Sequence, residues 1–98
     1  MMDAYGTYLA LMSRFLAHEL TASEFQYAFL QQFKHETRPI DAAMFELLDE
    51  LFGDIDSYTA DQTLLAEAPG FYLDEAGLRL KVEEILQRMK AQVLHDPA

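Results

Sequence analysis

The sequence contains no cysteine and no tryptophan, and it has only four glycines and three prolines. Without cysteine the chain cannot form a disulfide framework or a thiolate metal site, and this composition fits a reducing compartment. No glycine-rich loop that could cradle a phosphate is present. Half of the 98 residues are apolar and seven are Phe, so the chain can bury the core of one domain.

Long apolar runs and clusters of basic residues are also missing. No run approaches the roughly 20 apolar residues that a membrane-spanning helix needs. The N-terminal stretch carries Asp3 where a signal peptide would carry bases, and Arg14 interrupts the first apolar run. We therefore expect a cytoplasmic protein without membrane contact. The net charge of −10 opposes direct binding to nucleic acid, so the expected partner is a basic protein.

Four segments show the apolar spacing of amphipathic helices. The first covers residues 3–18. The second starts at Thr21, where the string TASE forms a capping box, and it stops before Pro39. We expect Pro39 in the first turn of the third helix. The fourth helix begins after Asp74, which caps it. The apolar stripes of the third and fourth helices are Met44, Leu47, Leu48, Leu51 and Ile55, and Leu78, Val82, Ile85, Met89 and Val93.

The connection between the third and fourth helices is long. Helical spacing fails over residues 57–72, apart from a short helical turn expected at Leu64–Leu65. No segment alternates as a strand would. The predicted fold class is therefore all-α, an antiparallel four-helix bundle with a long loop between helices 3 and 4. We expect residues 1–98 to form a single helical domain, with residues 94–98 as a loose tail.

Negative charge is concentrated in residues 41–75, which hold ten of the seventeen carboxylates and no lysine or arginine. On the third helix, acids of like charge stand three or four residues apart, and each such pair destabilises a helix by about 0.2–0.5 kcal/mol. The helix dipole also disfavours acids near the C-terminal end. These like-charge pairs and the acids at the helix end are unfavourable for folding and bring no evident gain in stability. Such a conflict favours a binding site over a merely solvated face. The candidate partner-binding residues are Glu46, Asp49, Glu50, Asp54, Asp56, Tyr58 and Asp61.

These carboxylates do not match a known catalytic or metal site. A catalytic pair needs one carboxyl with a raised pKa in a cleft, whereas these acids follow a helix surface without a nucleophile nearby. The string DIDSYTAD begins like a calcium loop, but Thr59 and Leu65 occupy the places that require glycine and glutamate. The three histidines, His18, His35 and His95, lack the spacing of a ligand pair. We expect no enzyme activity, metal or cofactor.

Two alternatives remain open at this point. Asp56-Ser57-Tyr58 is similar to the Asp-Ser-Leu motif to which carrier proteins attach phosphopantetheine. In carrier proteins that serine opens an acidic helix, whereas Ser57 follows the end of an apolar stripe. The second alternative is an acidic nucleic-acid mimic directed at some other DNA- or RNA-binding protein.

Four strings, in their order along the chain, resemble the colicin D immunity protein family of bacterial self-protective inhibitors. They are FLAHELTASEF at 15–25, DELF at 49–52, DIDSYTAD at 54–61 and FYLDEAGLRLKVEEILQRM at 71–89. The resemblance covers roughly residues 9–90. It implies a four-helix bundle that binds the C-terminal ribonuclease domain of a cognate toxin, which cleaves the anticodon loop of particular tRNAs.

The resemblance also implies how the partner is bound. Asp54, Asp56 and Asp61, with Tyr58 between them, are expected to cover the basic active-site cleft of the toxin and to imitate the negative tRNA. A monomer in a 1:1 complex follows. This chain has Thr59 and Ala60 where other members of the family can carry an acid, and its segment at residues 63–70 is longer. Both differences leave the identity of the toxin open.

Related immunity proteins also protect against contact-dependent inhibition toxins, so the mode of delivery stays open too. Two aromatic residues, Phe71 and Tyr72, are further anchor candidates for the partner. For Phe71 the favoured interpretation is packing against the core beneath the long loop.

Overall fold

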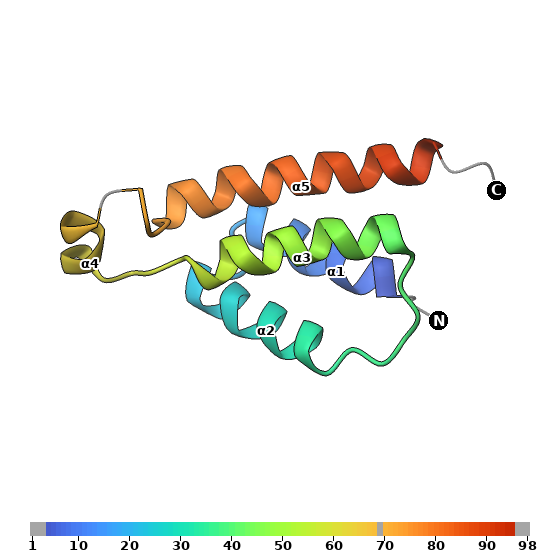
Figure 1. Cartoon of the computed structure of the whole chain (residues 1–98), viewed down its shortest axis with the longest axis horizontal. Helices are drawn as coiled ribbons and strands as arrows, with labels where there is room; N and C mark the ends of the chain where they lie inside the picture. Colours follow the sequence, from blue (N-terminus) through green and yellow to red (C-terminus); the bar gives the residue numbers. More distant parts are fainter. Residues whose placement is uncertain (1–3, 69, 96–98) are drawn as a thin grey trace.

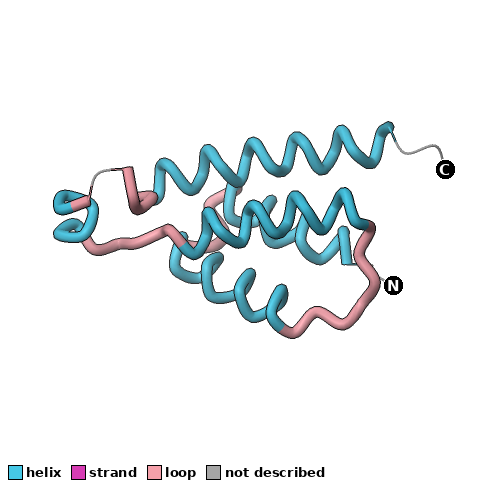
Figure 2. The backbone as a smooth tube through the Cα atoms, in the orientation of Figure 1, coloured by secondary structure: helices cyan, strands magenta, loops and turns pink. Residues whose placement is uncertain are grey.

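The computed structural model describes residues 4–68 and 70–95. Its helices are α1 (Ala4–Leu16), α2 (Ala22–Lys34), α3 (Ala42–Asp56), α4 (Gln62–Glu67) and α5 (Glu75–His95). Within the described ranges no strand occurs (Figure 2). An isolated parallel bridge joins Tyr58 to Leu73. The prediction of an all-α fold is confirmed.

The four long helices surround one hydrophobic core (Figure 1). α1 packs against α2 and α5, and α3 packs against the same two helices from the other side. The predicted apolar stripes of the third and fourth helices are buried, except that the side chain of Val93 lies outside the described residues. Burial of each large apolar side chain stabilises the fold by roughly 1.5–3 kcal/mol. The fully buried large side chains are Tyr8, Met12, Phe15, Phe25, Phe29, Leu48, Leu51, Ile55, Leu78, Val82, Ile85 and Met89.

The link between α1 and α2 is fixed by local hydrogen bonds. The predicted capping box is confirmed: the Thr21 amide donates to Glu24 Oε1 at 2.8 Å, and the Glu24 amide donates to Thr21 Oγ1 at 3.0 Å. α1 ends at Leu16, two residues before the predicted end, because His18 adopts a left-handed conformation with φ of 64°. The amides of His18 and Glu19 then donate back to carbonyls of the last turn, as in a Schellman motif.

α3 begins later than the sequence pattern predicts. Pro39 was expected in the first turn, and this prediction is wrong: the helix starts at Ala42. Asp41 is the N-cap, and its side chain accepts a hydrogen bond from the Met44 amide at 3.4 Å. The first amides of a helix have no partner within the helix, and an N-cap side chain can accept a hydrogen bond from one of them, whereas a proline side chain cannot. The aspartate therefore determines where the helix starts.

The long connection after α3 contains the short helix α4, which extends the expected turn at Leu64–Leu65. The two ends of the connection run side by side, since the Thr59 amide donates to the Leu73 carbonyl and the Leu73 amide to the Ser57 carbonyl, both at 2.9 Å. α4 consequently forms one end of the elongated molecule, which measures 47 × 23 × 22 Å (Figure 1).

The fourth long helix begins and ends at well-marked positions. Asp74 caps α5 as predicted, and its Oδ1 accepts from the Gly77 amide at 2.8 Å. α5 continues to His95, so residues 94 and 95 are helical where a loose tail was expected. Residues 96–98 lie outside the described residues. Arg79 joins this helix to α1: its Nη1 donates to the Phe15 carbonyl at 2.7 Å, and its guanidinium lies 4.3 Å from the Phe15 ring centroid.

Candidate functional site

The acids of α3 spread over a broad exposed surface whose two edges border different helices. A helix has 3.6 residues per turn, so residues seven apart share a side and residues four apart are neighbours. Asp49 and Asp56 lie on the side of α2, where they line a groove. Glu46 and Glu50 line a hollow against α5. Glu46 and Asp49 are three residues apart, so the two sets adjoin on the solvent side of α3, opposite the core stripe.

On the side of α5, one predicted site residue is already paired. Arg88 Nη1 donates to Glu50 Oε2 at 2.8 Å, and both side chains are about half exposed. An exposed pair of this kind contributes at most about 1 kcal/mol to stability. Glu46 faces the same hollow of about 420 Å³ and forms no ion pair with a described residue. The pair therefore removes part of the negative charge that the sequence assigned to this helix.

Asp54 is half-buried where α3 meets α5. Its Oδ2 is buried and has no hydrogen-bond partner among the described residues. Burial raises the pKa of this carboxyl, Lys81 acts to lower it, and the nearby Glu50 and Glu84 raise it further. Its position at the packed edge of α5 limits the contact that it can offer to a partner.

On the side of α2, the two acids are open. Asp49 and Asp56 are exposed. Neither forms an ion pair or a side-chain hydrogen bond with any residue in the described part of the chain. Because no base among the described residues pairs with them, both carboxylates are available to a cationic group that approaches this side of α3.

The segment that leaves α3 is held by the protein itself. Asp61 is the N-cap of α4, and its Oδ1 accepts from the amides of Thr63 at 2.9 Å and Leu64 at 3.4 Å. Tyr58 is half-buried against the core. Gln26 Nε2 donates to the carbonyls of Ile55 at 3.1 Å and Tyr58 at 3.4 Å. The segment is thus fixed by α2 at Tyr58 and by the cap of α4 at Asp61.

The expected packing of Phe71 against the core is wrong, because its side chain is 72% exposed. It contacts Tyr72 edge to face, with ring centroids 5.0 Å apart. The turn at Gly70, where φ is 86°, precedes Phe71 in the connection between α4 and α5. Because its ring is exposed, Phe71 remains a candidate contact for the partner.

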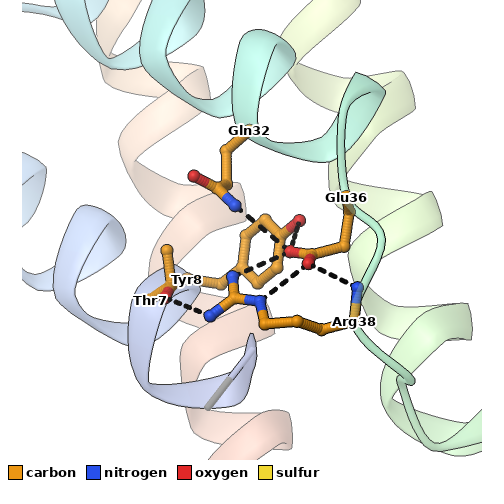
Figure 3. A network of polar contacts seen from close by, with 5 residues as sticks. All are labelled: Thr7, Tyr8, Gln32, Glu36 and Arg38. Atoms are coloured by element: carbon orange, nitrogen blue, oxygen red, sulfur yellow. Dashed lines mark hydrogen bonds and ion pairs between the residues drawn. The ribbon is translucent and has the colours of Figure 1, made fainter. Parts of the chain in front are cut away.

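Sequence analysis missed a polar network around Glu36, which lies in the link between α2 and α3 (Figure 3). Arg38 Nε donates to Glu36 Oε2 at 2.8 Å, and Nη2 donates to Oε1 at 3.0 Å. The Tyr8 hydroxyl and Gln32 Nε2 donate to the same carboxylate, at 2.8 and 3.2 Å. Arg38 Nη1 also donates to Thr7 Oγ1 at 3.1 Å. The network ties α1 to the end of α2 and to the link.

These contacts shift two pKa values. Hydrogen bonds from Arg38, and secondarily from Tyr8, hold the pKa of the Glu36 carboxyl far below its usual range despite its burial. Burial is the main cause of the raised pKa of the Tyr8 hydroxyl, and the Glu36 carboxylate raises this pKa further. The string Glu36-Thr37-Arg38 carries the signal for this pair, but the involvement of Tyr8 depends on the tertiary fold.

A family model described as bacterial self-protective colicin-like immunity matches residues 2–89 of this chain. The chain belongs to this family. The match spans α1 to most of α5, and it confirms the resemblance that the four sequence strings carry. A search among curated proteins gave no match.

Membership of the colicin-like immunity family implies binding to a cognate colicin-like toxin. The family is non-enzymatic, so the prediction that this immunity protein is not an enzyme is confirmed. Within the described residues no group of three or more acidic or histidine side chains could hold a metal ion. In the same residues, no helix combines the length and apolarity that a membrane crossing needs.

Ser57 takes a different position from that of a carrier serine. It is the C-cap of α3, and its Oγ donates to the Gly53 carbonyl at 3.0 Å. In carrier proteins the modified serine stands at the start of a helix, so this geometry gives no support to the carrier alternative. Ser57 acts in the immunity protein as a residue that closes a helix.

Proposed function

We propose that this immunity protein binds and neutralises a cognate tRNA-cleaving toxin. It covers the basic active-site cleft of the toxin with an acidic surface that imitates tRNA. It acts in the cytoplasm as a monomeric, single-domain antiparallel four-helix bundle, in a 1:1 complex. Family membership supports the toxin as partner, and the charge distribution supports a basic, RNA-binding target surface.

One observation carries this proposal: exposed acids of α3 that pair with no base in the described part of the chain. Glu46, Asp49 and Asp56 are exposed and form no ion pair with described residues. Asp61 continues the acidic surface at the start of α4. Opposite charges on two proteins steer their encounter, so association approaches about 10⁸–10⁹ M⁻¹s⁻¹ at low salt. Fast capture protects a cell that makes its own toxin.

The predicted site residues have different roles in this account. The three open acids and Asp61 contact the basic residues of the toxin cleft. Glu50 and Asp54 contribute to the long-range field, but Arg88 and the packing against α5 already engage them. Tyr58 offers the exposed part of its ring, and Phe71 offers most of its ring, as apolar contacts beside the acids.

The test begins with capture of partners from the source cell on the immobilised protein. The captured partner is then incubated with total tRNA, with and without added immunity protein. We expect a protein whose basic domain cleaves tRNA and which is inhibited at equimolar immunity protein. A partner that cleaves tRNA equally well when fully bound would refute inhibition at the cleft.

The acidic surface also favours a second candidate, a nucleic-acid mimic directed at some other basic protein. The same capture experiment separates the two. The second candidate predicts a DNA- or RNA-binding partner that cleaves no tRNA, and a neighbouring gene that encodes no toxin.

A further inference from the structure

A groove of about 640 Å³ lies between α2 and α3, on the side of the open acids. Its apolar floor comes from both helices, and two carboxylates stand at its edge. Lys34 is the one basic residue that lines the groove, and its side chain forms no ion pair with a described residue. The lining residues are Leu30, Gln31, Phe33, Lys34, Asp49, Phe52 and Asp56.

Aromatic rings continue beyond the groove. The Phe33 ring lies between Phe45 and Phe52, with centroid distances of 5.7 and 5.5 Å. Phe45 is 46% exposed, although it is a large apolar side chain. Tyr27 on α2 is 70% exposed and stands one turn before Leu30. A string of exposed apolar residues beside a groove is typical of a protein-binding surface.

The chemistry of the groove selects one kind of occupant. An acidic side chain would be repelled by Asp49 and Asp56, and a neutral apolar one would desolvate these carboxylates without pairing them. An arginine side chain satisfies both parts of the groove. Its aliphatic stem covers the apolar floor while its guanidinium stacks on a ring and donates to carboxylates in a planar fork.

The protein itself contains the same arrangement at another place. The Arg79 guanidinium lies 4.3 Å from the Phe15 ring centroid, and its Nε is 3.3 Å from Glu75 Oε2. There an arginine of the same chain contacts both the face of a phenylalanine ring and a carboxylate. In the groove between α2 and α3, the corresponding phenylalanines and acids lack such an arginine among the described residues.

We propose that this groove binds an arginine side chain from the nuclease domain of the toxin. The inference rests on the proposed function for the identity of the partner. It gives Asp49 and Asp56, which belong to the open acids of α3, a second role. The open field of α3 accelerates association, and the filled groove slows dissociation, because a desolvated arginine pair is lost only when the complex opens.

The first test needs no toxin. The ¹⁵N-labelled protein is titrated with N-acetyl-arginine methyl amide to tens of millimolar, at constant ionic strength, and in parallel with the uncharged citrulline analogue. We expect amide shifts concentrated in residues 30–34 and 49–56 for the arginine compound and much smaller ones for citrulline. Shifts spread evenly over all acidic residues, equal shifts for both compounds, or no shifts would each overturn the proposal.

Variants matched in charge sharpen this test. D49N/D56N removes two charges from the groove, and E19Q/E83Q removes two exposed charges from the α1–α2 link and α5. The first variant should lose the arginine-induced shifts, and the second should keep them. The groove acids form no ion pair or side-chain hydrogen bond within residues 4–68 and 70–95, so D49N/D56N should keep the circular dichroism spectrum of the wild type. F45A, which removes a half-exposed ring, should reduce the shifts without loss of helix.

The second test uses the captured toxin domain. D49N/D56N should raise the dissociation rate about tenfold or more, whereas E19Q/E83Q should leave it unchanged. If the wild type binds and D49N/D56N dissociates at the wild-type rate, the groove inference fails, and the proposed function is then judged by whether the bound wild type inhibits tRNA cleavage. If no toxin domain binds the wild type, the proposed function fails, and the titration with the arginine compound still decides whether the groove recognises arginine.

Discussion

Glu36 illustrates what a single residue contributes to this fold. Its side chain is only 7% exposed, and four side chains or backbone groups of the protein donate hydrogen bonds to it. The carboxylate joins Tyr8 on α1 to Gln32 on α2 and to Arg38 in the link (Figure 3). It therefore fixes the link that leads into α3, the helix that carries the acids.

We expect Glu36→Gln to lower the free energy of unfolding by about 1–3 kcal/mol at pH 7, because Arg38 loses its charged partner. The folded-state pKa of Glu36 lies below its ordinary value of 4.5. Its contribution is thus complete above about pH 4.5 and decreases as the pH falls further. Urea unfolding at several pH values should show the difference between wild type and variant shrinking below that pH. A pH-independent difference would contradict the assigned ionisation.

Asp54 should behave in the opposite way, because burial raises its pKa. A raised folded-state pKa favours folding when the group is protonated and opposes it once the pH exceeds the folded pKa. We therefore expect Asp54→Asn to stabilise the protein at pH 7, by less than about 1 kcal/mol because the site is half exposed. Chemical denaturation should show this gain vanish below pH 3.8, the ordinary pKa of the group. Asp41→Asn, at a helix cap, serves as the control.

At the scale of elements, three helix ends and one helix surface determine the arrangement. The end of α1 depends on a left-handed residue, the start of α3 on Asp41, and the start of α4 on Asp61. α3 then presents different acids to its two neighbours, since α2 borders Asp49 and Asp56 and α5 borders Glu50.

The left-handed position at the end of α1 gives a stability prediction. His18 has φ of 64°, which costs an L-residue about 1–2 kcal/mol, and glycine avoids this cost at an entropic penalty of about 0.5–1 kcal/mol. We expect His18→Gly to raise the free energy of unfolding by roughly 0.5 kcal/mol. Lys90→Gly, in the exposed interior of α5, should lower it by about 1 kcal/mol. Destabilisation by both variants in thermal unfolding would argue against the left-handed cap.

The division of α3 predicts an effect of Arg88 on binding. Arg88→Ala releases Glu50 from its pair, so the negative field grows. We expect association with the toxin domain to become about two- to threefold faster at low salt, with a stability change below about 1 kcal/mol. Stopped-flow measurements at several salt concentrations would test this. Slower association would mean that Arg88 itself contacts the partner.

At the scale of the whole molecule, sequence patterns predicted the helices well but not the partners of the charges. The stripes of α3 and α5, the capping box at Thr21 and the cap at Asp74 follow from spacing and local chemistry. Residues 41–75 contain no base, so the sequence suggested one open acidic block. Folding brings Arg88 from α5 against Glu50 and buries part of Asp54, and no local pattern could show these long-range contacts.

The groove was missed for a similar reason. Phe33 and Phe52 follow the apolar spacing of their helices, but only the packing of α2 on α3 makes a partly open surface from them beside Asp49 and Asp56. Phe71 was placed beneath the loop because large aromatic residues are usually buried, whereas the turn before it leaves the ring exposed. The net charge of −10 nevertheless indicates a basic partner from the sequence alone.

The central claim is that the acidic surface occupies the place of tRNA on the toxin. The most direct test is competition between the immunity protein and a non-cleavable anticodon stem-loop for the captured toxin domain, followed by fluorescence anisotropy of the labelled RNA. The account predicts that the protein displaces the RNA completely and that the two never bind together. A stable ternary complex of toxin, RNA and immunity protein would contradict it.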